Sequence, residues 1–213
     1  MKIIVVDYGL GNLYNLANAF QCCGQTVQLT RSVEALLEAD ALILPGVGAF
    51  GDGMARLKEW GLDKAIQSFA ATQGTIMGIC LGMQLLMDWS EEFGFHEGLG
   101  LIKGGVKHLK NIESFDKEAK VPHVGWNDIQ IREKTHLLEG LTNRDMYFVH
   151  SYCAVTDDQS ETLATVSYGG AELTAIIGKG NIYGCQFHPE KSSQNGIQIL
   201  RNFINMVVEV ADG

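Results

Sequence analysis

Short apolar runs alternate with stretches of helical periodicity over residues 1–90. Four segments have the continuous or alternating apolar pattern of buried strands. They span residues 2–8, 26–30, 41–44 and 75–80. Apolar residues recur with helical spacing at 13–23, 33–39, 53–71 and 81–89. Gly24 is placed to end the first helix and Gly61 to interrupt the third. This βαβαβαβα order predicts an α/β fold, with a mostly parallel central sheet and helices on both faces.

Beyond residue 100 the pattern changes to short strand candidates separated by turn residues. They span residues 127–131, 146–150, 152–156, 162–168, 173–177 and 181–187. Few helices intervene, so we expect antiparallel or mixed strands added to the parallel core. The segment 195–210 has one apolar face and predicts a closing amphipathic helix. Neither a repeat nor a linker is evident, so we expect a single domain over residues 1–213.

Composition narrows the functional classes. The chain of 213 residues is 46% hydrophobic and 19% charged, with a formal net charge of −9. These values are typical of a globular protein and argue against a nucleic-acid partner. Neither a membrane-spanning apolar run nor a signal-peptide pattern is evident, so we expect a cytoplasmic protein. The 5 cysteines form no CxxC pair, which argues against a zinc site or a disulfide framework, and no cofactor is expected. Four of them lie in apolar segments and are expected to be buried: Cys22, Cys23, Cys153 and Cys185.

The remaining cysteine, Cys80, lies between a strand candidate and a helix candidate, with Gly78 and Gly82 on either side. A corner of this kind pushes one side chain out at the carboxyl edge of a parallel sheet. Free amides at the start of the next helix favour a thiolate there and can hold an oxyanion, and the amide of Leu81 is best placed. We therefore interpret Cys80 as a nucleophile rather than a cysteine that only packs in a turn.

A nucleophilic cysteine needs a base, and the base needs an orienting group. Among the 6 histidines, His188 stands out because it ends the strand candidate 181–187 and precedes Pro189, which restricts it to extended geometry. Glu190 follows two residues later, and in an extended chain such side chains lie on the same side. We expect Glu190 to orient the imidazole of His188 and to stabilise its charged form.

The segment 46–51, GVGAFG, satisfies the G-x-G-x-x-G pattern of dinucleotide-binding loops. It follows the third expected strand rather than the first, and the loop after the first strand has Tyr14 where the third glycine belongs. We therefore expect no nucleotide here. The glycines suit a close approach to the corner at Cys80, where amides near Val47 and Gly48 would supply a second oxyanion donor.

With these residues identified, the chain resembles the class I, or triad, glutamine amidotransferases. The segments that carry this resemblance are GICLGMQ (78–84) and QFHPEKS (186–192). Further motifs narrow it to the glutaminase subunits of imidazole glycerol phosphate synthases. They are DYGLGNLYN (7–15), LPGVGAFGDGM (44–54), VPHVGWN (121–127) and YFVHSY (147–152). The resemblance covers nearly the whole chain and implies a flavodoxin-like fold.

The resemblance also assigns roles. It implies that Cys80 is the nucleophile, His188 the general base and acid, and Glu190 the orienting carboxylate. The residues implied to hold the α-amino and α-carboxylate groups of glutamine are Gln84, Glu92, His150, Ser151 and Tyr152. The implied partner is a TIM-barrel cyclase subunit that receives the ammonia and forms a heterodimer with this chain. The candidates for that contact are Asn12, Asn15, Pro122, Trp126 and Tyr147.

Three alternatives remain open from the sequence. Segments 90–104 and 178–192 also resemble paralogous amidotransferases that supply ammonia for amino-sugar synthesis in bacterial surface polysaccharide. A binding module that kept the fold without catalysis is disfavoured because Cys80, His188 and Glu190 are all present. A different Cys-His hydrolase on a similar fold is disfavoured by the His-Pro-Glu sequence at the end of the strand.

Overall fold

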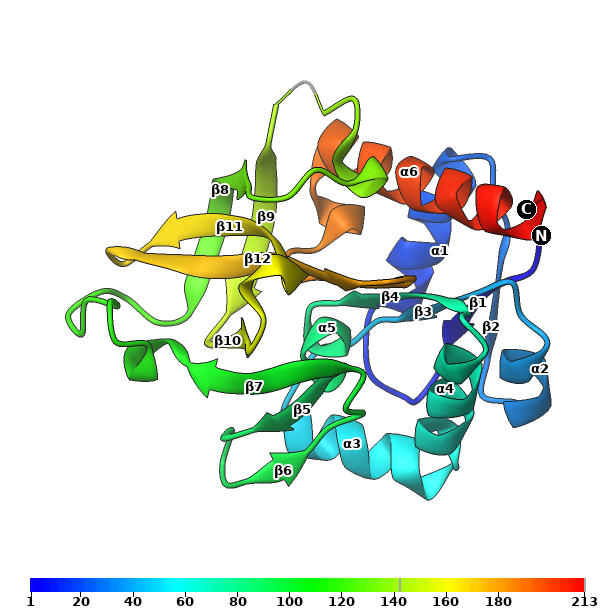
Figure 1. Ribbon diagram of the computed structural model, residues 1–213, viewed down its shortest axis with the longest axis horizontal. Coiled ribbons are helices and arrows are strands. Elements are labelled where there is room, and N and C mark those ends of the chain that lie inside the picture. The colour runs from blue at the N-terminus through cyan, green and yellow to red at the C-terminus, as the bar shows by residue number, and fades with distance from the viewer. Residues whose placement is uncertain (142, 213) are drawn as a thin grey trace.

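A nine-stranded sheet forms the centre of the fold (Figure 1). The computed structural model describes residues 1–141 and 143–212. The strands are, in spatial order, β2 (Val27–Thr30), β1 (Ile3–Val6), β3 (Ala41–Leu44), β4 (Thr75–Ile79), β13 (Ile182–Cys185), β12 (Ala171–Lys179), β11 (Thr162–Tyr168), β8 (His123–Ile131) and β9 (Asp145–His150). Strands β2 to β13 in this order run parallel, and β12 to β9 are added antiparallel. The predicted α/β class, with antiparallel strands added in the second half, is confirmed.

Helices cover both faces of the parallel part of the sheet. They are α1 (Leu13–Cys22), α2 (Val33–Leu37), α3 (Phe50–Glu59), α4 (Leu62–Ala71), α5 (Leu81–Leu85) and α6 (Ser193–Asp212), with 3₁₀ turns η1 (Leu109–Asn111), η2 (His136–Leu138), η3 (Gln159–Glu161) and η4 (Pro189–Lys191). Figure 1 shows α1 and α6 on one face, and α3 and α4 on the other. In β1, Ile3 and Val5 pack beneath the first pair, whereas Ile4 and Val6 pack beneath the second. Burial on both faces explains the continuous apolar run.

A second sheet was not expected from the sequence. Its strands are, in order, β10 (Tyr152–Thr156), β7 (Ile102–His108), β5 (Met87–Ser90) and β6 (His96–Glu97). The helix expected over 81–89 ends at Leu85, and the residues from Met87 onward pair with β7 instead. The carbonyl of Leu86 accepts from the amides of Leu101 and Ile102. Pairing between distant segments has therefore overridden the local helical periodicity.

The cysteines differ in burial. Cys153 and Cys185 are buried and Cys23 is partly buried, but Cys22 is exposed at the end of α1, so the expectation that it is buried was wrong. All five thiols are free. Across residues 1–141 and 143–212, no helix has both the length and the apolar character to span a membrane, and no group of three His, Cys, Asp or Glu side chains could hold a metal ion.

Candidate active site

The corner at Cys80 is a sharp turn between β4 and α5. Cys80 has φ 54° and ψ −111°, a backbone conformation that a residue with a side chain rarely adopts. Its amide donates to the carbonyl of Cys185 on the adjacent strand β13 at 2.8 Å, which ties the corner to the sheet. Such strain costs on the order of 1–3 kcal/mol, and it persists only where the surrounding structure holds it. The turn leaves the sulfur at the carboxyl end of the parallel strands.

The two glycines beside Cys80 are required by close packing. A Cβ on Gly82 would lie 1.6 Å from the carbonyl oxygen of Leu44 on β3. A Cβ on Gly78 would lie 2.6 Å from the backbone nitrogen of Met83. Neither gap accepts a methyl group, so the G-x-C-x-G spacing brings α5 directly against the strands and holds the turn in place.

His188 and Glu190 form a buried pair behind the cysteine. Nδ1 of His188 lies 2.8 Å from Oε1 of Glu190, and the two side chains are only 4% and 5% exposed. The expectation that both residues lie in extended chain was only half right. His188 is extended, but Pro189 begins the 3₁₀ turn η4, because proline is preorganised for a first helical position. The turn, rather than strand alternation, returns the Glu190 carboxylate to the ring.

The surroundings of His188 favour its charged form. Burial alone lowers the pKa of His188, but its interactions with the Cys80 thiol and the Glu190 carboxylate outweigh burial and raise this pKa to about 9. The ring is therefore protonated at neutral pH. Its Nε2 is buried and has no hydrogen-bond partner within the described residues, which leaves this nitrogen available for a proton transfer.

The glycine loop 46–51 is held near this corner by a tyrosine that the sequence did not single out. The hydroxyl of Tyr8, in the loop after β1, donates to the carbonyl of Pro45 at 2.5 Å. A Cβ on Gly46 would lie 2.2 Å from that hydroxyl and 3.0 Å from Cβ of Leu81. Gly46 is therefore the residue that lets the loop pass between Tyr8 and the corner at Cys80. Gly48 has φ +112°, which also favours glycine.

A cleft of about 370 Å³ opens at the sulfur. The residues that line it are Val47, Gly48, Cys80, Leu81, Gln84, Glu92, Pro122, Val149, His150, Ser151, Tyr152 and His188. All of the oxyanion and substrate-binding candidates are in this set, with the candidate nucleophile and base. Glu190 lies behind His188 and does not line the cleft. The structure thus brings these candidates to one place, while their roles remain predictions.

Hydrogen bonds fix the orientation of Gln84 in the cleft. Its Nε2 donates to the carbonyl of Tyr152 at 3.1 Å and to Oε1 of Gln186 at 3.0 Å. Both N–H donors are therefore used, which leaves Oε1 of Gln84 to accept from a substrate cation. Gln186, which the sequence did not single out, is fully buried and points its Nε2 at Sγ of Cys80, 3.8 Å away. Its position two residues before His188 was the available signal, because alternate residues of a strand share a face.

Glu92 presents a second acceptor to the cleft. Its Oε2 accepts from the amide of Phe50 at 2.6 Å, which orients the carboxylate and leaves Oε1 available. Burial raises the pKa of Glu92, and the bond from Phe50 partly offsets this rise. With Oε1 of Gln84, this carboxylate suits an α-ammonium group.

The partner candidates lie in two groups, and among them only Pro122 lines the cleft. On β8 and β9, Trp126 pairs with Tyr147 and Val124 pairs with Val149, so these four side chains share one face. This β8–β9 patch (Val124, Trp126, Tyr147 and Val149) is largely exposed, with Trp126 at 52% and Val124 at 54%. The exposed Pro122 precedes it. The sequence had not indicated Val124 or Val149.

Asn12 and Asn15 form the second group, at the exposed start of α1. Oδ1 of Asn12 accepts from the amide of Asn15 at 3.2 Å and thereby caps the helix. Asn12 also lines a small hollow of about 10 Å³ together with His188 and Glu190. This asparagine therefore lies close to the buried pair as well as on the surface.

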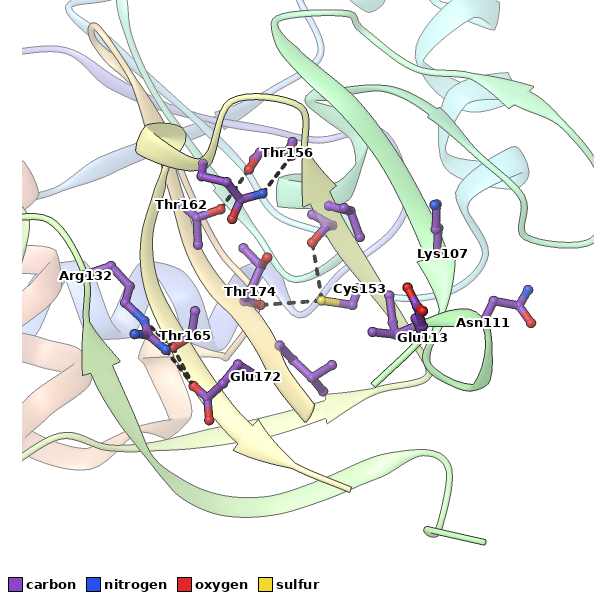
Figure 2. Close-up of a pocket in the computed structure, with 15 residues that line it drawn as sticks. Lys107, Asn111, Glu113, Arg132, Cys153, Thr156, Thr162, Thr165, Glu172 and Thr174 are labelled. Carbon is purple, nitrogen blue, oxygen red and sulfur yellow. Dashed lines mark hydrogen bonds and ion pairs between the residues drawn. The ribbon is translucent and has the colours of Figure 1, made fainter. Parts of the chain in front are cut away.

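A larger hollow of about 670 Å³ lies elsewhere, between β10, β11, β12 and η1 (Figure 2). Several of its polar side chains bond to one another: Arg132 reaches Thr165 and Glu172, and Thr156 bonds to Thr162. The thiol of Cys153 donates to the carbonyls of Ala154 and Thr174. Within the described residues no buried polar side-chain atom on its wall lacks a partner. Size alone therefore does not make this hollow a site, and the candidate nucleophile and base line the smaller cleft instead.

Known proteins resemble this chain over its length. The profile of the family described as "Glutamine amidotransferase class-I" matches residues 4–207. The imidazole glycerol phosphate synthase subunit HisH of Sulfurimonas denitrificans is 49% identical over 202 residues, which cover 94% of this chain and 96% of that protein. The subunit of the same name from Bacillus subtilis is 43% identical over 205 residues, which cover 96% of each chain.

Solved structures agree in fold. A crystal structure described as a glutamine amidotransferase has a TM-score of 0.75 at 19% identity and covers 96% of this chain and 98% of its own. PurLQS from Thermotoga maritima has a TM-score of 0.74 at 20% identity, covering 97% and 98%. At these identities the likeness establishes the fold alone. Together with the family match and the HisH relatives, it shows that this chain belongs to the class I glutamine amidotransferase family.

Proposed function

We propose that this chain is the glutaminase subunit of an imidazole glycerol phosphate synthase, acting in histidine biosynthesis as one domain over residues 1–213. It hydrolyses the side-chain amide of glutamine to glutamate and ammonia. The observation that carries the proposal is that Cys80 and His188, with Glu190 behind the ring, meet at a cleft whose other polar groups suit an amino acid. The names of the relatives that share 43–49% of their residues with this chain support the pathway.

The first half of the reaction forms a thioester. The sulfur of Cys80, having given its proton to His188, attacks the carboxamide carbon, and the carbonyl oxygen becomes an oxyanion. The amides of Leu81 and of the loop at Val47 and Gly48 are the proposed donors to this oxyanion. The intermediate collapses as the C–N bond breaks, and the proton on Nε2 of His188 goes to the departing nitrogen, which leaves as ammonia.

The second half releases glutamate. His188, now neutral, takes a proton from a water that attacks the thioester carbon. The C–S bond then breaks and the cysteine is regenerated. Glu190 stays ionised throughout, holds Nδ1–H of the ring and stabilises the imidazolium. The raised pKa of His188 supports this order of events, because the ring already carries its proton when the amide nitrogen must be protonated.

The ammonia implies a partner. Free ammonia in water is protonated and stops being a nucleophile, so a synthase has to receive it within a closed interface. The proposed partner is a TIM-barrel cyclase subunit that forms imidazole glycerol phosphate and aminoimidazole carboxamide ribotide. The β8–β9 patch supports this surface, because large exposed apolar side chains such as Trp126 are enriched at the centre of interfaces. Its position at the cleft mouth would place the partner where ammonia leaves.

An amidotransferase for amino-sugar synthesis would use the same thiol chemistry. The reported relatives at 43–49% identity are named as HisH subunits, which favours the histidine pathway over this alternative.

The experiment is a glutaminase assay of the chain purified alone and purified with a cyclase subunit, with and without the cyclase's nucleotide substrate. We expect glutamate release that rises in the complex with its ligand and is abolished by Cys80→Ala. Glutamate release that survives Cys80→Ala would contradict the mechanism. A wild-type chain that binds no cyclase, but supports an amino-sugar synthase, would favour the alternative pathway.

A further inference from the structure

A series of hydrogen bonds enters the cleft from β8. The side chain of Asn127 lies 2.8 Å from Nε2 of His123. Nδ1 of His123 lies 3.0 Å from Nε2 of His150 on β9. Nδ1 of His150 lies 2.9 Å from the carbonyl oxygen of Tyr152. Two of these residues, Asn127 and His123, do not line the cleft, yet they connect to the strand that forms its wall.

The carbonyl of Tyr152 fixes the direction of the series. A carbonyl can only accept, so Nδ1 of His150 must carry a proton. His150 is 6% exposed, and burial lowers its pKa to about 3, so its ring is neutral. In a neutral ring the other nitrogen is an acceptor. Nε2 of His150 therefore accepts, and Nδ1 of His123 must donate to it.

The same count of donors and acceptors determines how the side chain of Asn127 is oriented. Burial also lowers the pKa of His123, so a His123 ring protonated at Nδ1 has an accepting Nε2. The group of Asn127 that faces it must then be the amide nitrogen rather than the oxygen, and a carboxamide presents either end after a half-turn. Every donor in the series then points from Asn127 toward Tyr152.

Packing leaves the His123 ring little freedom other than its tautomer. The residue is fully buried. Its ring stacks on Tyr168 of β11 at 4.0 Å between centroids and on Phe148 of β9 at 4.9 Å, with interplanar angles of 18° and 17°. The titratable groups that face it are His150 from β9 and Tyr168 from β11, and His150 in turn faces His188.

We propose that His123 and Asn127 are positioning residues of the glutamine cleft. Asn127 sets the tautomer of His123, His123 sets that of His150, and His150 then holds the Tyr152 carbonyl. Gln84 donates to this same carbonyl and, through Gln186, is linked to Cys80. The series therefore holds the wall on which Ser151 and Tyr152 meet the substrate. This inference rests on the proposed glutaminase function for its effect on activity, but not for its prediction of tautomers.

The tautomers are measured directly by long-range ¹H–¹⁵N NMR of the imidazoles in the complete chain at pH 7. We expect His123 and His150 to be neutral and protonated at Nδ1, which is the less common tautomer of a free histidine. The proposal is overturned if the ring of His123 or that of His150 is protonated at Nε2 alone, or if one of the two rings is charged. This readout needs no activity, so it separates this proposal from the proposed function.

Asn127→Asp and Asn127→Ala test the functional consequence in the complex with the cyclase subunit. A carboxylate at 127 only accepts, so it keeps the direction of the series only while His123 is charged. We expect the KM for glutamine of Asn127→Asp, relative to wild type, to rise about tenfold with increasing pH, as His123 loses its charge and the series inverts. The alanine side chain forms no hydrogen bond with His123 and therefore favours neither tautomer. We expect the ratio of the KM of Asn127→Ala to that of wild type to stay constant with pH.

Thermal unfolding of both variants controls for loss of fold. If the two variants show the same ratio to wild type at every pH, the direction of the series has no influence on the cleft and the proposal is wrong. Absence of glutaminase activity in the wild type would instead count against the proposed function, and the NMR result would still decide the positioning series.

Discussion

Nδ1 of His188 lies 2.8 Å from Oε1 of Glu190 in a pair that is almost closed to solvent. Glu190→Gln keeps the shape of the side chain but removes the charge that stabilises the imidazolium. We expect kcat for glutamine hydrolysis to fall by roughly 10⁴-fold, as when the carboxylate of a catalytic triad becomes an amide. Steady-state glutamate release by the complex measures this fall. A variant with wild-type kcat would remove Glu190 from the mechanism.

The same pair predicts alkaline loss of stability. The pKa of His188 is about 9 in the folded chain, against 6.5 for an unperturbed ring. The extra stability is therefore complete below pH 6.5 and is lost as the pH rises through about 9. The free energy of unfolding should fall across this window by the part of the shift that Glu190 causes, because a proton that passes from Cys80 to His188 leaves the number of bound protons unchanged. Urea unfolding at several pH values measures it, and a curve for Glu190→Gln as steep as wild type would contradict this source.

His150 predicts a loss of stability at acid pH, opposite in direction to the alkaline loss predicted from His188. Its ring is neutral when folded, with a pKa of about 3, and takes up a proton near 6.5 when unfolded. Its contribution is present above pH 6.5 and declines as the pH falls toward 3. Between pH 6.5 and pH 5 we expect a loss of about 2 kcal/mol, and His150→Gln should flatten this part of the curve. If the free energy of unfolding of that variant fell as steeply with decreasing pH as that of the wild type, other groups would be the cause of the acid loss.

The close packing of Gly82 beside Cys80 predicts that alanine substitutions at two glycines differ in their effect on the free energy of unfolding. Gly82→Ala places a methyl group against the Leu44 carbonyl, and we expect a loss of about 3 kcal/mol or more, because backbone cannot move aside as a side chain does. Gly24→Ala is the matched control. Gly24 has φ +82° but open space around it, so only the backbone preference is lost, about 1–2 kcal/mol. Chemical denaturation of both variants makes the comparison, and equal losses would remove the packing explanation.

The β8–β9 patch predicts where the partner binds. Trp126→Ala removes the largest exposed side chain of the patch, and we expect affinity for the cyclase subunit to fall by about 2 kcal/mol or more, as at an interface hot spot. Phe95→Ala is the control, because Phe95 is 71% exposed and lies beside β6, where it stacks on Trp89. Isothermal titration calorimetry measures both. Equal affinities for the two variants would place the interface elsewhere.

Most of the parallel half of the fold could be predicted from the sequence. Strands buried on both faces are unbroken apolar runs, and Gly24 and Gly61 mark helix boundaries. It did not predict the second sheet. Met87 to Ser90 continues a helical pattern locally, and only its pairing with β7, which lies outside that pattern, makes it a strand. The pairing of β5 with β6 is similarly short and has almost no periodicity of its own.

The candidate site residues could be identified from the sequence where a reactive side chain lies in a local motif. Cys80, His188 and Glu190 each have a local signal of glycines or proline. Tyr8, Gln186 and His123 had weaker signals, since a tyrosine, a glutamine or a histidine in a strand is ordinary until its neighbours are known. Their importance comes from what they touch across the sheet: the Pro45 carbonyl, the Cys80 sulfur and the His150 ring.

Strand β13 is bonded to β4 on one side and to β12 on the other, with Cys185 opposite Ile79. Cys80 follows Ile79 by one residue, and His188 follows Cys185 by three. The pairing of β4 with β13, together with the bond from the His188 amide to the Tyr147 carbonyl, therefore sets the separation of the candidate nucleophile and base. Slippage by one rung would shift the histidine about 3.3 Å and turn it to the opposite face. The relative position of the candidate nucleophile and base is thus determined when the sheet assembles, so we expect a docked partner to act on the residues that surround this pair.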